Sequence, residues 1–372
     1  MKRWLLAFLL LAGCSNDAKE PEIFQEETSA YEKQEEIEAP VEWDAAAVAA
    51  TLQAYLRSHD FNGVALVAQN GNVLFNEGFG LAHTQKEAPM AADHKFQIAS
   101  LSKSFAAVSI LQLVEQGLLS LEATLDQFFP QMHRSSEITV HHLLTHSSGL
   151  FSGDDLTLYS QPTSIYALIR YGFYPQYQFF NTIGEGTIYS NVGYDILGAI
   201  VEQVSGMAYE DYIQTYILDR VGMPSTGLNR EGAFLKRLAT PYWGHISAAD
   251  PAPPFHPSFG FASGGLHSTA YDLFQYIQAL VVDQTLLSFE SLQKMTRPHY
   301  RVGRAYHGYG FFIDARGVSN TISHTGNLLG WHGVLIQELD NAATVILLTN
   351  HGAGQDMQKG FNMAQLVLNL VP

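Results

Sequence analysis

Cysteine is almost absent from this chain of 372 residues, in which Cys14 is the single example. One cysteine cannot form an intramolecular disulfide, and its position near the N-terminus leaves no thiol for catalysis in the body of the chain. Basic residues are also scarce, because 20 Lys and Arg face 36 Asp and Glu, for a formal charge of -16. Nucleic-acid binding depends on clustered Lys and Arg, so we exclude nucleic acid as a partner.

The apolar run at the N-terminus is too short to span a bilayer as a helix. It covers residues 4–12 and follows Lys2 and Arg3, which is typical of a signal peptide. The run ends in Leu-Ala-Gly-Cys14, which resembles the bacterial lipobox, where cleavage precedes a lipid-bearing cysteine. We therefore predict a signal peptide over 1–13 and an exported protein held at the cell envelope by a lipid on Cys14. A plain signal peptide with an incidental cysteine is the alternative.

Apolar periodicity is weak between Cys14 and Asp44. Residues 15–44 carry eleven acidic side chains against two lysines, a net charge of -9. Such a composition cannot bury enough apolar surface to fold, so we predict an acidic flexible tether over 14–44. The predicted folded domain covers 45–372.

Two common hydrolase signatures are missing. The chain contains no Gly-x-Ser-x-Gly pentapeptide, which excludes the nucleophile elbow of the α/β-hydrolases. His141, His142 and His146 are spaced to share a helical face, but Leu143 stands where a His-Glu-x-x-His enzyme has its Glu. A metallohydrolase built on these histidines is a distant alternative.

The periodicity of the remaining chain predicts an α+β fold. Residues 45–57 read as a helix capped by Asp44, and 63–69 with 73–80 read as a β-hairpin about the turn 70–72. Three further strands and a closing helix are predicted at 320–324, 331–338, 344–350 and 356–370. We expect one antiparallel sheet built from both termini and flanked by helices. It forms an α/β part at about 45–101 and 296–372, with a mostly helical insertion at about 102–295.

Ser100 and Lys103 stand three residues apart at the start of a predicted buried helix that ends at Gly117. This spacing places both side chains on one face within a turn of each other. Burial disfavours the charged form of a lysine, so Lys103 could accept the Ser100 proton or hold a neighbouring base. The alternative is that Ser100 simply caps the helix.

Two more polar clusters follow at a distance. Tyr189-Ser-Asn191 precedes a strongly periodic helical stretch over 192–204. His324-Thr325-Gly326 ends a predicted strand, where a glycine lets a substrate backbone lie close. Each residue also has a structural alternative. Tyr189 could be a core tyrosine, Asn191 could cap the helix, and His324 could pack within the strand. Trp331 and His332 could be either strand residues or part of the wall of the cleft.

In this order and at these separations, the three clusters resemble the active-site set of class C β-lactamases, D-alanyl-D-alanine peptidases and related esterases. Four other segments match that family, and the resemblance covers about 48–371. The segments are His142-Leu-Leu-Thr-His-Ser-Ser-Gly149, Tyr189 through Val221-Gly222-Met223, Ser263-Gly-Gly-Leu-His-Ser-Thr269 and Tyr309-Gly-Phe311. The resemblance implies a β-lactamase/transpeptidase-like fold with an inserted all-α subdomain.

The resemblance also implies roles for single residues. Ser100 would be the nucleophile, Lys103 its partner and Tyr189 the general base or proton relay. Substrate binding would fall to Asn191, His324, Thr325, Gly326 and Asn327. The backbone N–H groups of Ser100 and Asn327 would form the oxyanion hole. No metal or other cofactor is implied, and we expect a monomer.

His324 departs from the class C β-lactamases, which usually have a lysine there facing the substrate carboxylate. A largely uncharged imidazole attracts a carboxylate less than an ammonium does. We therefore expect an acyl-enzyme hydrolase acting on D-amino-acid peptides, esters or β-lactam-like amides. The alternatives are a class C-type β-lactamase and a non-catalytic sensor of cell-wall peptides or penicillin.

Overall fold

The structure is a computed structural model that describes residues 43–150, 183–230, 235–243, 250–252, 256, 258, 260–314, 320–351, 362 and 366. Cys14, the predicted signal peptide and the tether up to Glu42 lie outside these residues. Most of the predicted closing helix also lies outside them, although its described residues Asn362 and Leu366 are both helical. Within the described segments, none of the helices combines the length and apolar character needed to cross a membrane.

The described helices and strands come largely in runs of one kind along the chain. The helices are α1 (Ala45–Ser58), α2 (Ser102–Glu115), α3 (Val140–Leu144), α5 (Asn191–Ser205), α6 (Tyr209–Ile213), α7 (Asp219–Val221), α8 (Phe261–Gly264), α9 (Ala270–Ile277) and α10 (Phe289–Thr296). The strands are β1 (Gly63–Gln69), β2 (Asn72–Phe79), β3 (Leu81–His83), β4 (Ala88–Pro89), β5 (Phe96–Gln97), β6 (Gly227–Leu228), β7 (Tyr242–Trp243), β8 (Asp250–Pro251), β9 (Leu266–Ser268), β10 (Tyr300–Val302), β11 (Ala305–His307), β12 (Phe312–Asp314), β13 (Thr321–Leu328), β14 (Trp331–Glu338) and β15 (Ala343–Thr349).

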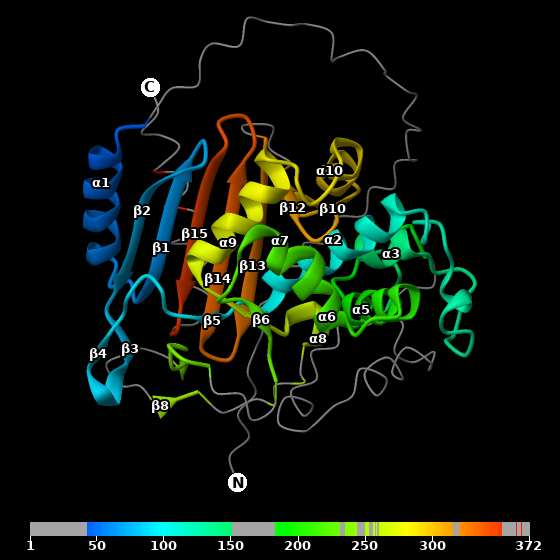
Figure 1. The fold of residues 1–372 in the computed structure, drawn as a ribbon, viewed down its shortest axis with the longest axis horizontal. Coiled ribbons are helices and arrows are strands. Elements are labelled where there is room, and N and C mark those ends of the chain that lie inside the picture. The colour runs from blue at the N-terminus through cyan, green and yellow to red at the C-terminus, as the bar shows by residue number, and fades with distance from the viewer. Residues whose placement is uncertain are drawn as a thin grey trace, which may run out of the picture. The chain divides into compact units, whose positions relative to one another are not determined.

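The main sheet is antiparallel and has eight strands in the order β10-β11-β12-β13-β14-β15-β1-β2. Strand β1 pairs with β15, with Gly63 opposite Thr349 and Gln69 opposite Ala343. The hairpin near the start of the folded body therefore joins the strands from its end (Figure 1). This confirms the predicted sheet built from both termini.

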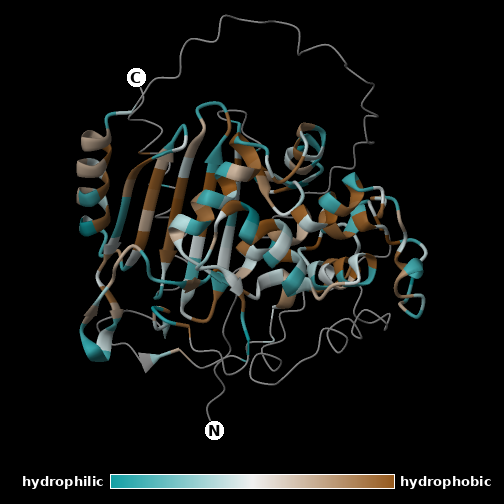
Figure 2. Ribbon diagram, viewed as in Figure 1, coloured by the Kyte–Doolittle hydropathy of each residue, from teal (hydrophilic) through white to brown (hydrophobic). Residues whose placement is uncertain are grey.

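The central strands are buried on both faces. In β1, Val64 and Leu66 belong to the large core shared with the helical part, whereas Ala65 and Val67 belong to a smaller core under α1. Because successive side chains of a strand point to opposite faces, one continuous apolar strand serves both cores. Figure 2 shows the hydrophobic colouring concentrated along these strands.

Helix α1 covers one face of the sheet for a local reason. The Asp44 carboxylate accepts hydrogen bonds from the backbone N–H groups of Ala46 and Ala47, and the buried Val48, Leu52 and Leu56 recur at helical spacing. This confirms the predicted helix. At the end of the predicted tether, Trp43 is also buried in this core.

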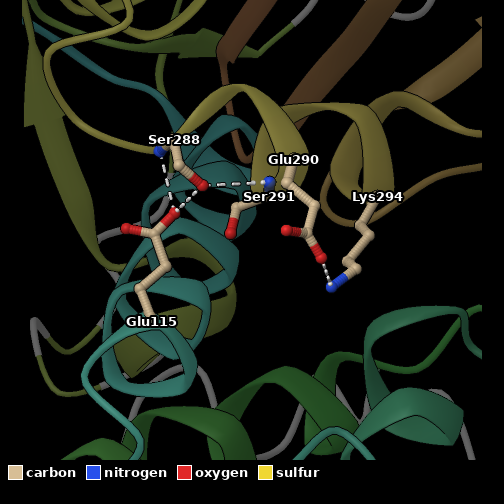
Figure 3. Close-up of polar contacts among 5 residues, drawn as sticks. All are labelled: Glu115, Ser288, Glu290, Ser291 and Lys294. Atoms are coloured by element: carbon tan, nitrogen blue, oxygen red, sulfur yellow. Dashed lines mark hydrogen bonds and ion pairs between the residues drawn. The ribbon is translucent and has the colours of Figure 1, made fainter.

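Helix α2 runs through the helical part and is buried almost throughout its length. Its last residue, Glu115, accepts hydrogen bonds from the backbone N–H and the hydroxyl of Ser288, at 2.8 and 2.6 Å. The same hydroxyl caps α10 by accepting from the Ser291 N–H (Figure 3). The two helices are thus joined end to end by one carboxylate and one capping serine.

The structure adds short strands that the sequence pattern did not predict. Strands β5, β9 and β6 form a small three-stranded sheet, so the inserted part is not wholly helical. Strands β10, β11 and β12 extend the main sheet, although each has only three residues. Three residues are too few to show a period of two, which is why the pattern missed them.

Candidate active site

Ser100 lies in a 3-10 turn, Ala99–Leu101, directly ahead of α2. Ala99 has φ +47°, in the left-handed region that non-glycine residues rarely occupy, and such strain collects at functional sites. The turn and the helix have Ile98 and Leu101 as N-caps, neither with a side-chain hydrogen bond. The Ser100 side chain therefore does not act as a helix cap; its Oγ lies 3.1 Å from Lys103 Nζ.

Lys103 is fully buried and donates three hydrogen bonds. Its Nζ lies 3.1 Å from Ser100 Oγ, 2.6 Å from Asn191 Oδ1 and 2.7 Å from the carbonyl oxygen of Ser263. An ammonium carries three protons, and each one has an acceptor here. These partners offset the cost of burying a charge, so the geometry fits a protonated Lys103 that points one N–H at the nucleophile.

The start of α5 presents Tyr189 and Asn191 to Lys103. Ser190 is the N-cap, and its hydroxyl accepts from the Gly193 N–H at 3.0 Å. Asn191 is therefore not the capping residue, and its side chain binds Lys103 instead. The Lys103 Nζ lies 4.8 Å from the centre of the half-buried Tyr189 ring. A cation at this distance stabilises negative charge on the phenol.

Asp195, one turn along α5 from Asn191, completes the support of Lys103. Its carboxylate accepts the Ser263 N–H at 2.9 Å, and the Ser263 carbonyl in turn accepts from Lys103. Burial raises the Asp195 pKa to about 6, although hydrogen bonds from Ser263 and the Lys103 charge act in the opposite direction. Sequence reasoning missed Asp195, because an aspartate within a periodic helix carries no motif.

Strand β13 forms the facing wall and continues to Leu328, past the predicted end at His324. Gly326 packs against the turn that carries Ser100, and a Cβ added there would overlap the carbonyl oxygen of Ile98. Only a glycine lets the strand approach this closely.

His324 is buried, and its Nδ1 donates to the Thr325 carbonyl oxygen at 2.7 Å. Burial, followed by the nearby Lys103 charge, lowers the pKa of His324 to about 3. The ring packs 5.0 Å from Phe312. His324 is therefore neutral at physiological pH, and its second nitrogen, Nε2, can only accept a hydrogen bond.

His332 and Trp331 lie in different surroundings. His332 Nδ1 donates to the side-chain oxygen of Asn327 at 2.5 Å, which places His332 beside the cleft. Trp331 is buried in the core as a strand residue.

A cavity of about 280 Å³ brings these elements together. Its described lining contains no Lys or Arg side chain. Lys103 lies beneath it and Gly326 within its strand wall, whereas the other predicted site residues line it. The described lining consists of Ala99, Ser100, Tyr189, Asn191, Gly260, Ser263, Gly264, Phe312, His324, Thr325, Asn327 and Leu328.

The three histidines considered for a metal make separate contacts. His141 Nδ1 shares a hydrogen bond of 2.8 Å with the Tyr309 hydroxyl, and His142 Nδ1 accepts the Thr139 N–H. His146 Nδ1 accepts the Ser190 N–H. Among the described residues, no group of three or more His, Cys, Asp or Glu side chains is arranged to hold a metal ion.

The model of the β-lactamase family matches residues 48–368. The chain belongs to the β-lactamase family. Penicillin-binding protein 4* of Bacillus subtilis is 28% identical over 314 residues, which are 78% of this chain and 68% of that protein. Esterase EstB of Burkholderia gladioli is 29% identical over 370 residues, 82% of this chain and 91% of the esterase.

A solved structure of a penicillin-binding protein from Bacillus halodurans shows the same fold. Its TM-score is 0.76 at 24% identity, and the match covers 86% of this β-lactamase-family chain and 98% of that chain. The predicted β-lactamase/transpeptidase-like fold is thus confirmed. Membership of this family, with its penicillin-binding and esterase relatives, also confirms the predicted serine hydrolase.

Proposed function

We propose that this protein hydrolyses esters, and less efficiently D-amino-acid peptides, through an acyl-enzyme on Ser100. The observation that carries the proposal is the Ser100 hydroxyl, held 3.1 Å from a buried lysine at a cavity that Tyr189 also lines. Acyl transfer requires a hydroxyl nucleophile, a proton acceptor and donors for the developing oxyanion.

In the proposed reaction, Tyr189 takes the Ser100 proton as Ser100 Oγ bonds to the substrate carbonyl carbon. Since all three Lys103 protons have acceptors, Lys103 acts as the cation that stabilises the Tyr189 phenolate. The oxyanion would lie against the backbone N–H groups of Ser100 and Asn327. Tyr189 then protonates the leaving alcohol or amine as the carbonyl bond to that group breaks. The Tyr189 phenolate then accepts a proton from a water whose oxygen bonds to the acyl carbon. Tyr189 passes that proton to Ser100 Oγ as the bond between Oγ and the acyl carbon breaks, which releases the acid.

The chemistry of the described lining supports an ester as the preferred substrate. A carboxylate beside the scissile bond would find no Lys or Arg side chain on this lining, and the neutral His324 offers no free N–H. Phe312 and Leu328 instead provide apolar contacts for an uncharged acyl or alcohol group. The similarity to an esterase over most of that enzyme's length agrees with this preference.

The test compares four substrates on the purified full chain: p-nitrophenyl butyrate, a peptide ending in D-Ala-D-Ala, a chromogenic cephalosporin and a fluorescent penicillin. We expect the ester to have the highest kcat/KM and Ser100→Ala to abolish turnover and covalent labelling. Ser109→Ala, a buried serine on the same helix whose hydroxyl bonds the Phe105 carbonyl, is the matched control and should keep full activity. Cephalosporin turnover above that of the ester would instead identify a β-lactamase. Full ester turnover in Ser100→Ala would exclude the proposed nucleophile.

We further propose that the enzyme is exported and held at the cell envelope by a lipid on Cys14. The lipobox-like residues at the end of the N-terminal apolar run support this location. Growth of expressing cells with an alkyne-tagged fatty acid should label the wild type, and Cys14→Ala should remove the label and release the protein from the membrane fraction. Labelling that persists in Cys14→Ala would refute the anchor.

A further inference from the structure

His146 packs against Tyr189 and is not part of the described cavity lining. Its imidazole is 3% exposed and stacks on the Tyr189 ring, with 4.4 Å between ring centres and 27° between planes. His307 packs 4.8 Å from the same imidazole. The His146 backbone has φ +58°, a left-handed conformation that is uncommon outside glycine but in which histidine occurs more often than most residues.

His146 also holds the backbone on both sides of Tyr189. Its Nδ1 accepts the N–H of Ser190 at 3.0 Å. Its carbonyl oxygen accepts the N–H of Ile188 at 2.9 Å and the hydroxyl of Thr187 at 3.2 Å. One residue thus fixes the segment before Tyr189, the segment after it and the face of its ring.

The same hydrogen bond keeps the imidazole neutral. A nitrogen that accepts from a backbone N–H carries no proton, and burial, with the Lys103 charge acting in the same direction, lowers the His146 pKa well below its usual range. Tyr194, which also packs on His146, is a phenol whose pKa burial raises. A charged His146 would place a second cation against Tyr189 and compete with Lys103.

We propose that His146 is the positioning residue for Tyr189, fixing the phenol toward Ser100 by the ring stack and by the Ser190 hydrogen bond together. The inference rests on the proposed role of Tyr189 as proton acceptor. A misplacement of about 1 Å in a reacting group can lower a rate by about 100-fold, so loss of this support should lower the acylation rate.

Two substitutions separate the two contacts. His146→Phe keeps a ring for the stack but removes the acceptor for the Ser190 N–H. His146→Asn removes the ring, keeps an oxygen near the position of Nδ1 and suits a left-handed backbone. The matched control is His142→Phe, which removes the same kind of bond, from the Thr139 N–H, a few residues away in the same segment.

The measurements are kcat and KM for p-nitrophenyl butyrate and the rate of Ser100 labelling by a fluorophosphonate, on the full chain. We expect His146→Phe to lower kcat and the labelling rate by about 30- to 100-fold with KM changed less than about twofold. His146→Asn should lose less than about tenfold, and His142→Phe should stay within about twofold.

A double-mutant cycle distinguishes positioning from general damage to the fold. If His146 acts through Tyr189, a His146 substitution added to Tyr189→Phe should lower the rate by less than about threefold more. Fully multiplicative losses would overturn the inference, as would wild-type rates in both single variants. If His146→Phe does not fold, His146→Asn takes its place in the cycle. A wild-type rate in the Tyr189→Phe variant would overturn both the proposed proton acceptor and this inference. A lower rate in Tyr189→Phe together with wild-type rates in the His146 variants would overturn only this inference.

Discussion

The two faces of the main sheet are built from different chemistry. On the face covered by α1, apolar side chains that include Trp43, Leu52 and Phe75 form the core. On the other face, apolar packing surrounds buried polar side chains, among them Lys103 and Asp195. An apolar core gains stability from any well-fitting hydrophobic residue, whereas a buried charge or imidazole is tolerated only with specific partners. The first face contributes stability, and the second holds the chemistry.

The backbone shows the same contrast. On the α1 side, left-handed residues such as Asp60, Asn70 and Ala342 lie in turns outside the helix and strands. On the site side, Ala99 immediately precedes Ser100 and His146 stacks on Tyr189. Strained residues persist where the surrounding structure fixes them, so the site depends on the packing around it.

The largest expected effect is on the acylation rate, and it should come from Lys103→Met or Tyr189→Phe on the site face of the sheet. Each removes a group that acts on the Ser100 proton or on the charge that replaces it, so acylation should fall by about 10²- to 10⁴-fold. The labelling rate of Ser100 by a fluorophosphonate measures this loss. Lys294→Met, which removes an exposed lysine paired with Glu290 (Figure 3), is the control and should leave the rate unchanged. Comparable losses in Lys294→Met would contradict the special role of Lys103.

Leu52→Ala tests the stability of the apolar face. Leu52 is fully buried under α1, and its truncation leaves a cavity that should lower the free energy of unfolding by about 2–5 kcal/mol. Urea denaturation measures the loss, while kcat of the folded enzyme should stay at the wild-type value. Arg57→Ala, exposed on the same helix, should change stability by less than about 0.5 kcal/mol. A fall in kcat with Leu52→Ala would show that the two faces are not separable.

Gly326→Ala affects the contact between strand β13 and the nucleophile turn. The added methyl group would overlap the Ile98 carbonyl oxygen, so the strand and the turn must separate. We expect kcat/KM to fall by about 10- to 100-fold, because small misplacements of reacting groups have large effects on rate. Gly117→Ala adds a Cβ that meets no atom, although its left-handed backbone (φ +71°) is strained by a side chain. It therefore controls for general destabilisation away from the site and should keep kcat/KM within about twofold. Wild-type kcat/KM in Gly326→Ala would show that the close approach is unnecessary.

The smallest expected effect is on the pH dependence of stability. Burial lowers the pKa of His267, His299 and His307 to about 4 and that of His324 to about 3. Because the unfolded chain binds these protons first, the free energy of unfolding should decrease as the pH falls from about 6.5 toward 4. Asp195, with its raised pKa, acts in the opposite direction over about pH 4 to 6.

Thermal denaturation at pH 7, 6 and 5 measures this dependence. His324→Asn should lose less stability than the wild type over that range, because one buried imidazole no longer has to stay neutral. His59→Asn, which replaces an exposed histidine at the end of α1, should follow the wild-type curve. An identical pH dependence in all three proteins would show that buried His324 contributes no proton linkage.

Sequence patterns predicted the regular elements well where the pattern was long. Helix α1, the β1–β2 hairpin, β14, β15 and α5 lie within a residue or two of their predicted bounds. Strands β10–β12 were not predicted, because three residues are too few to show a period. The small sheet of β5, β9 and β6 was not predicted either, since its strands lie far apart in the chain. Ser190 rather than Asn191 caps α5, because only the fold shows which polar side chain turns back to the helix.

Within the site, the local spacing of Ser100 and Lys103 correctly predicted their proximity. The remaining supports were beyond the pattern. Asp195 acts through a carbonyl from residue 263, and His146 was weighed only as one of three metal-binding histidines. Asp195 carries no motif, and the family-matching segment that contains His146 gave that residue no role, because each one's role depends on a segment more than forty residues away.

The sequence alone determined the continuous apolar runs of a sheet buried on two faces, the Asp44 cap of α1, and a serine one helical turn from a lysine. These depend on neighbours within a few residues, where dihedral preferences and side-chain periods act directly. The tertiary structure alone decided that Lys103 finds three acceptors, that His324 stays neutral and that a tyrosine and a histidine stack beside them. Those properties come from burial and from partners brought together by long-range packing, which no local spacing specifies.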